Sequence, residues 1–332
     1  MFFHLLLKLV RIHSLLLLIA LSLTPQELLA QGHEDEIVAN LSGGRVIIHV
    51  ANDIIIFAAI DQPIEANPAP PRVMNLDSTH VGVLLGASEW QSPADPKPFR
   101  IDRNMTHIGA RDPRYQDDPT GAEPDLETMG VALLEKLRPL AAQLHHKLNF
   151  PSEEPLLEVV IIGFAPNNYG PEVWTAEFRI DQEQIASKED YWQTRVLRPR
   201  FTQLYPPEGK HSPRTLVEVR YPADAPGVPL AGLLQQNDPS VARLRSSDPR
   251  FSKVVDNIEK GQAQKASAAD STDFLRAVVP IIAGNARFVI GTMEEQRGFH
   301  WIVEPDEPIE KVKEDKNRPA DAPTLRGRPG PQ

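Results

Sequence analysis

The side chains that could hold a metal ion or transfer protons form no familiar catalytic motif in this chain of 332 residues. His145 and His146 are adjacent on a predicted helix, so their side chains point about 100° apart and cannot share one ion as an i, i+4 pair does. His49 and His80 lie on or beside predicted strands and could meet only if those strands were neighbours. The zinc-protease, serine-hydrolase, P-loop and dinucleotide-binding motifs do not occur. We therefore predict no metal and no cofactor.

The composition limits the partners of the chain. The formal net charge is −10, and the chain contains no cysteine. A chain this acidic is not expected to carry the basic patch that a nucleic-acid backbone requires, so we predict that it binds no nucleic acid. Without cysteine, neither a disulfide nor a thiolate metal site can form.

The N-terminus predicts export. Residues 1–30 have the pattern of a signal peptide, with Lys8 and Arg11 before an apolar run at 15–23 and a cleavage position after Ala30. The run is shorter than the ~20 residues that span a bilayer. We expect a periplasmic or extracellular protein with no stable membrane span after cleavage, and an uncleaved anchor is the alternative.

Two stretches near the start of the mature chain predict strand pairs. Arg45–Asp61 contains two runs rich in Ile and Val that are separated by Asn52-Asp53, a pair suited to a tight turn. Arg72–Trp90 contains a short strand, a turn, and an apolar strand that ends near Gly86. These runs are apolar almost throughout rather than alternating, which predicts strands covered on both faces.

The rest of the chain predicts a mixture of helices and strands. The expected elements are a helix at 125–148, a hairpin of Leu156–Phe164 with Glu172–Ile180, a strand at Thr215–Tyr221, helices at 251–263 and Ser271–Ala283, and closing strands at Arg287–Ile290 and Gly298–Val303. Ser271 or Thr272 is the expected N-cap of the last helix.

The order of these elements resembles a proteasome-type subunit of the N-terminal-nucleophile (Ntn) hydrolase superfamily. The resemblance rests on the two opening stretches, on the small residues Gly86-Ala87-Ser88 ahead of a helix, on the hairpin at 159–178, and on the helix and strands of Phe274–Val303. It implies an α+β fold built as a four-layer αββα sandwich.

The same resemblance implies the domain organisation. A single domain would span 31–303, with insertions at about 91–127 and 188–250 that the family pattern lacks. Residues 304–332 are rich in proline and charge and are expected to form a disordered tail.

The resemblance also implies a site. In this family the residue that opens the first strand is the nucleophile, and its free amine acts as the base. Alignment through the Asn-Asp turn places this position near Ser42, although the better-aligned neighbour is a glycine. The family's lysine aligns with Arg72, its acid with Asp61 displaced by one or two positions, and its oxyanion-hole glycine with Gly86, beside the substrate-binding edge. Because arginine stays protonated, it cannot exchange a proton as a tuned lysine can.

Each of these residues also has a structural interpretation. Ser42 could be a turn residue, Arg72 could pair with a carboxylate such as Asp61 or lie in solvent, and Gly86 could simply end a strand.

Three functional hypotheses follow. The first is an exported protein of proteasome-like fold that lacks catalysis and has a binding, scaffold or assembly role, with a homo-oligomer implied by the resemblance. The second is an amide hydrolase or peptidase with Ser42 as a processed nucleophile. The third is an unrelated α+β binding protein of the cell envelope.

Overall fold

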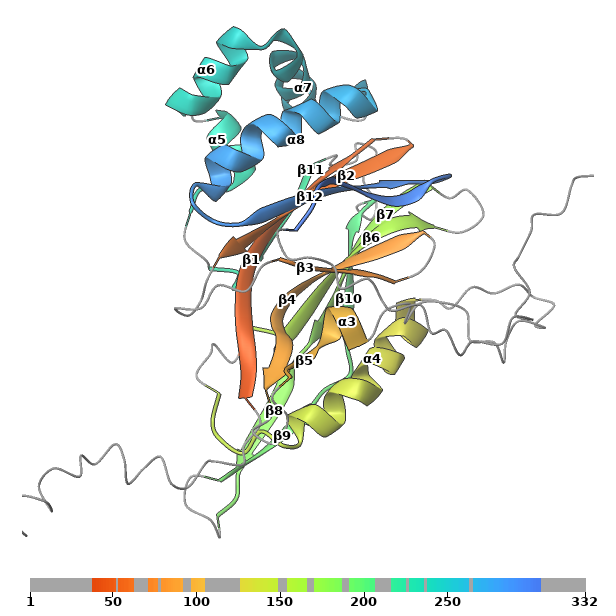
Figure 1. Cartoon of the computed structure of the whole chain (residues 1–332), viewed down its shortest axis with the longest axis vertical. Coiled ribbons are helices and arrows are strands. Elements are labelled where there is room, and N and C mark those ends of the chain that lie inside the picture. The colour runs from red at the N-terminus through yellow and green to blue at the C-terminus, as the bar shows by residue number, and fades with distance from the viewer. Residues whose placement is uncertain are drawn as a thin grey trace, which may run out of the picture.

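The computed structural model describes residues 38–51, 53–62, 71–76, 79–91, 97–104, 126–148, 154–165, 170–186, 191–206, 216–224, 227–235, 238–262 and 265–305. The predicted signal peptide and residues 306–332 of the predicted tail lie outside these ranges. The fold mixes helices with antiparallel sheets, as the sequence predicted at this coarse level (Figure 1).

The described strands pair only in antiparallel fashion. In chain order they are β1 (Val38–Val50), β2 (Ile54–Gln62), β3 (Arg72–Asn75), β4 (His80–Gln91), β5 (Phe99–Arg100), β6 (Leu157–Ala165), β7 (Gly170–Phe178), β8 (Ile180–Gln184), β9 (Trp192–Val196), β10 (Arg200–Tyr205), β11 (Leu216–Tyr221), β12 (Phe288–Glu294) and β13 (Gly298–Val303). The described helices are α3 (Ile101–Asn104), α4 (Leu126–Ala141), α5 (Leu230–Gln235), α6 (Pro239–Ser247), α7 (Pro249–Glu259) and α8 (Ala268–Ala283).

Strand β1 links two sheets into one hydrogen-bonded network of 11 strands. Its first part, Val38–Ser42, pairs with β4 in the sheet ordered β10-β7-β6-β4, which we call the first sheet and which also includes β3 and β5. Its second part, Gly43–Val50, pairs with β2 and β11 in the sheet ordered β11-β1-β2-β12-β13, the second sheet. β8 and β9 form a separate two-stranded ribbon.

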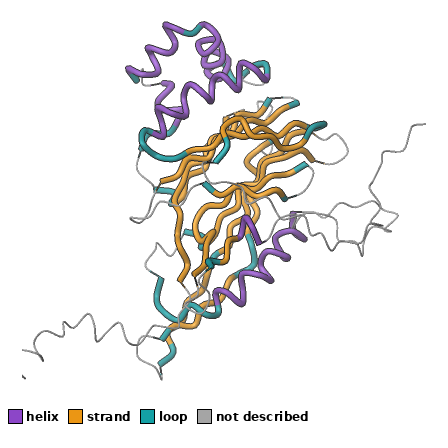
Figure 2. Tube along the Cα trace, in the orientation of Figure 1, coloured by secondary structure: helices purple, strands orange, loops and turns teal. Residues whose placement is uncertain are grey.

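Three buried apolar clusters hold the layers together. One lies between the sheets and includes Phe57 and Val83. The second lies between α4 and the first sheet, with Leu137 as a fully buried member. The third packs α5–α8 on the second sheet and includes Phe274. Because both faces of the central strands are covered, their apolar runs do not alternate, as predicted. Figure 2 shows α4 and the α5–α8 group on opposite sides of the strands.

The helix expected at 125–148 ends at Ala141, so its predicted length was wrong. Pro139, in the last turn of α4, cannot donate a backbone hydrogen bond. Beyond the helix, Leu144 remains fully buried in the cluster between α4 and the first sheet. The hydroxyl of Thr194 on β9 donates to the Leu144 carbonyl oxygen at 2.9 Å. The leucine spacing therefore predicted which face of the segment is buried, but it did not predict where the helix ends.

The predicted N-cap of the last long helix was also wrong. α8 begins at Ala268, and the hydroxyl of Ser267 accepts a hydrogen bond from the Asp270 amide at 3.1 Å. Ser271 is instead fully buried within the helix. The segments expected as insertions contribute regular structure. β5 and α3 fall within 91–127, whereas 188–250 supplies β9, β10, β11, α5 and α6.

Candidate functional site

The structure brings together the four positions that the resemblance singled out. Ser42 on β1 lies directly opposite Gly86 on β4. Two residues along β1, Gly44 lies opposite Asp61 on β2. Arg72 is the first residue of β3 and pairs with Leu84 of β4, two positions before Gly86. β3 and β1 pair with the same edge of β4, because β6 occupies the other edge.

Asp61 is a buried carboxyl at this junction of the two sheets. It retains 3 % exposure, and its own amide donates to the carbonyl oxygen of Arg287 at 2.8 Å. Burial raises the pKa of Asp61 to about 6, and the nearby Arg287 and Arg72 guanidinium groups counteract part of that rise. The carboxyl is thus held in a poorly solvated place, facing positive charge.

Arg72 forms an ion pair with Glu89 of β4. Its Nη2 donates to a Glu89 carboxylate oxygen at 3.0 Å, and the arginine side chain is only 5 % exposed. Glu89 was not predicted as its partner. Because arginine side chains stay protonated, this guanidinium supplies a fixed positive charge and cannot accept a proton.

The strand that carries Ser42 does not begin there. Val38–Leu41 continue β1 in the N-terminal direction and pair with β4 from Gln91 to Ala87, around an irregularity between Asn40 and Leu41. Ala39 is a buried member of the cluster beneath α4, and Leu41 packs against that cluster. Ser42 is therefore an internal residue of a continuous strand, and the chain itself occupies the β4 edge beside Gly86.

Gly86 has a backbone conformation that requires glycine. Its φ is +87°, and a Cβ atom built there would lie 2.5 Å from the Leu156 carbonyl oxygen and 2.9 Å from the Tyr221 hydroxyl. That hydroxyl is itself fixed, because it donates to the Pro155 carbonyl oxygen at 2.7 Å. The neighbouring amide of Ala87 donates to Leu156 at 2.8 Å. Close packing at the sheet junction therefore accounts for this glycine.

β6 carries a buried carboxyl that was not predicted from the sequence. Glu158 lies opposite Leu85 on β4 and opposite Glu177 on β7, and it is 8 % exposed. Burial raises the pKa of Glu158 to about 8, and the negative charges of Glu177 and Glu154 add to the rise. A single glutamate inside the apolar run LLEVVII was the signal that could have revealed it.

The two strand histidines do not meet. β1 and β4 pair only through Val38–Ser42, and the His49 ring lies 6.2 Å from the Phe274 ring of α8. Both ring nitrogens of His49 are buried without a hydrogen-bond partner, and burial lowers its pKa to about 4. The Nε2 atom of His80 instead lies 3.0 Å from the carboxylate of Glu172. Within the described ranges, no group of three or more His, Asp or Glu side chains is placed to hold a metal ion.

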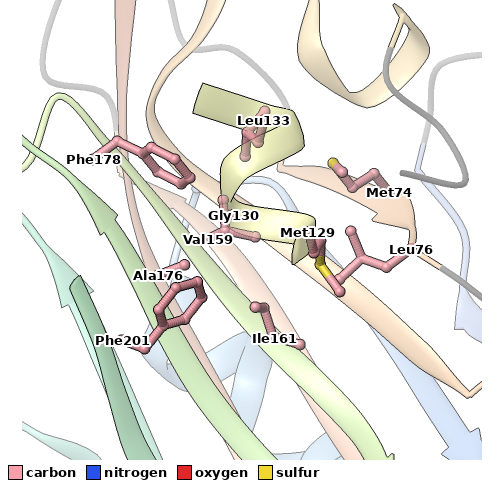
Figure 3. Close-up of a pocket in the computed structure, with 10 residues that line it drawn as sticks. All are labelled: Met74, Leu76, Met129, Gly130, Leu133, Val159, Ile161, Ala176, Phe178 and Phe201. Carbon is pink, nitrogen blue, oxygen red and sulfur yellow. The ribbon is translucent and has the colours of Figure 1, made fainter. Parts of the chain in front are cut away.

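An apolar cavity opens between α4 and the first sheet (Figure 3). The cavity is partly open to solvent and has a volume of about 10 Å³, room for roughly one water molecule, and its lining side chains carry no nitrogen or oxygen. A small-molecule site normally includes polar groups that orient the ligand, and this cavity offers none from its side chains. Its lining residues are Met74, Leu76, Met129, Gly130, Leu133, Val159, Ile161, Ala176, Phe178 and Phe201.

No protein-family model matches the chain, and no curated protein matches it. Among the helices in the described part of the chain, none is both long and apolar enough to cross a membrane.

Proposed function

We propose that this protein is an exported, non-catalytic member of the proteasome-like fold with a binding, scaffold or assembly role. One observation carries the proposal, namely the continuity of β1 through Ser42. An Ntn nucleophile uses its own free amine as the base, and a serine inside a strand has no free amine. The residues before Ser42 are also integrated into the fold, since Ala39 belongs to a buried core cluster.

The layer order supports the proteasome-like fold. α4, the first sheet, the second sheet and α5–α8 follow one another, with an apolar cluster at each of the interfaces between them. This is the succession that an αββα sandwich requires. The meeting of Ser42, Gly86, Asp61 and Arg72 at one junction is what descent from an Ntn hydrolase would leave behind.

The charged groups at the junction support the absence of catalysis. Arg72 stands where the family has a lysine, and it is committed to Glu89. Because an arginine side chain does not give up its proton to become a base, Arg72 cannot take the lysine's part in proton transfer. The occupied β4 edge leaves no backbone groups there for an extended substrate to pair with.

The direct pairing of Ser42 with Gly86 favours one second candidate, an amide hydrolase that becomes active after processing. Such processing would cut the chain between Leu41 and Ser42. It would release Val38–Leu41 from β4 and remove Ala39 from its core cluster. The structural cost of that cut makes this the weaker candidate.

A hydrolysis assay on the exported protein tests the proposal. Wild type and Ser42→Ala are incubated with a library of fluorogenic peptide amides, and turnover is followed alongside a heat-inactivated sample. We expect equal, background-level rates for both proteins. Turnover by wild type that Ser42→Ala abolishes, with the variant still folded by circular dichroism, would overturn the proposal and establish the second candidate.

A further inference from the structure

Strand β13 is an edge of the second sheet. Within the described ranges it pairs with β12 alone, and it forms the dark blue end of the ribbon in Figure 1. The strand GFHWIV contains no charged residue and no proline. Lysine, aspartate or proline on an edge normally blocks unwanted pairing, so β13 lacks these protections.

Both faces of β13 are largely apolar. The Phe299 ring stacks on Phe57 at 6.0 Å, and the Trp301 ring meets Phe299 edge-on at 4.7 Å. Ile302 and Val303 pack against the cluster beneath the helices. Apolar side chains on both faces of β13 therefore contact the rest of the fold. They hold the outer backbone edge, which no other described strand pairs with, in an extended form.

Opposite charges flank the strand. Arg297 precedes it with a side chain that is 75 % exposed, and its loose contact with Glu294 is 3.6 Å long. Glu304 follows it and is exposed. Trp301 and Val303 oppose adjacent residues of β12, so Ile302 is an extra residue in β13. If two β13 strands lie antiparallel about a two-fold axis through His300, Arg297 lies three positions before the axis and Glu304, without the extra residue, three positions after it. Arg297 of each copy then lies opposite Glu304 of the other. Opposite charges that face each other across strands stabilise the pairing.

We propose that the β13 edge binds a second copy of this chain, by antiparallel pairing of the two β13 strands about a two-fold axis. The second sheet would then run continuously through both copies, in an isologous interface. Ile302 forms a bulge against β12, where its neighbours Trp301 and Val303 oppose Gly291 and Ile290. The extra twist at this bulge keeps the pairing short, so the charges at its two ends determine whether it forms.

This inference names the assembly surface and the partner, and in that respect it rests on the proposed function. Its failure is nevertheless distinguishable, because self-association and hydrolysis are separate measurements. Monomeric protein without turnover would remove only the β13 interface. Dimeric protein with Ser42-dependent turnover would remove only the non-catalytic assignment.

The test is sedimentation of the full exported chain at ionic strength near 0.15 M, where screening weakens the repulsion between two acidic copies. Wild type should be dimeric at micromolar concentration. Arg297→Glu and Glu304→Arg each place like charges at both ends of the pairing and should weaken self-association at least tenfold. The double exchange restores opposite charges across the axis and should restore the dimer.

A matched control excludes a general effect of surface charge. Arg250 is 68 % exposed and pairs with Asp273 away from β13, so Arg250→Glu should leave the dimer unchanged. Monomeric wild type, unchanged association of both single variants, or a double exchange that fails to restore association would each overturn the proposal. A full chain that dimerises only after deletion of 306–332 would also overturn it, because the chain's own C-terminal segment would then occupy the edge.

Discussion

Ser42 and Gly86 lie directly opposite each other, on β1 and β4, at the point where β1 passes from one sheet to the other. Upstream of this pair β1 belongs to the first sheet, and downstream it belongs to the second. The pair therefore joins the two sheets through one continuous strand. The proposed loss of catalysis rests on this continuity, because Ser42 has no free amine as long as the chain is not cut between Leu41 and Ser42.

Gly86→Ala should destabilise the fold strongly. Alanine is strained at a φ of +87°, and its Cβ would lie 2.5 Å from the Leu156 carbonyl oxygen. Together, backbone strain and overpacking should lower the free energy of unfolding by about 2–4 kcal/mol, measured by urea denaturation.

Gly170→Ala is the matched control. Gly170 has a φ of +94° but nothing within 4 Å of a built Cβ. Only the strain of its backbone conformation applies, so a loss of about 1 kcal/mol is expected. Equal losses for the two variants would contradict the close packing at Gly86.

Glu158→Gln should change the pH dependence of stability. Because the pKa of Glu158 is raised to about 8 in the folded state, its contribution is fully present below pH 4.5 and is lost as pH rises through 8. Glutamine does not titrate, so the decline between these values should become shallower in thermal unfolding followed across pH. Glu183, whose side chain is 71 % exposed, provides a control in Glu183→Gln, for which no such change is expected.

His49→Leu should remove a sensitivity to acid. The pKa of His49 is lowered to about 4 in the folded state, so its contribution to stability is present above pH 6.5 and is lost as pH falls through 4. At neutral pH the variant should be more stable by about 1–3 kcal/mol, because two buried ring nitrogens without hydrogen-bond partners disappear.

The control for His49→Leu is Thr194→Val. Thr194 is also buried, but its hydroxyl donates to Leu144 and accepts from the Gln182 amide at 2.9 Å. Its loss should destabilise the protein, since buried partners are then left unpaired. If His49→Leu proved as damaging as Thr194→Val, the assignment of His49 as an unpaired core residue would be contradicted.

The sequence predicted the buried strands better than it predicted the residue at which a helix begins. Unbroken apolar runs such as Ile54–Ala58 predicted strands covered on both faces, and burial by two layers explains why this inference held. The N-cap of α8 was predicted at Ser271 or Thr272, whereas the structure has it at Ser267, at least four positions earlier. Several small polar residues in 267–272 could each cap a helix. Only packing decides among them.

The candidate site could be located only through the family resemblance. The pairing of Ser42 with Gly86 joins residues that are far apart in the sequence, and no local pattern predicts it. Gly44 pairs with Asp61 within the hairpin that the Asn-Asp turn predicts, but the turn does not predict that Asp61 is buried. The Arg72–Glu89 ion pair and the raised pKa of Glu158 both depend on side chains from different strands. Which charges pair, and which carboxyl is removed from water, depend on the tertiary structure and cannot be predicted from residue spacing.

The most direct test of the central claim is the N-terminus of the protein purified from cells that express the full chain, determined by N-terminal sequencing together with intact mass. Our account predicts a start near Gln31, with Ser42 internal and β1 intact, in wild type and in Ser42→Ala alike. A wild-type chain that starts at Ser42, alongside a Ser42→Ala chain that keeps the preceding residues, would show self-processing and would contradict the account.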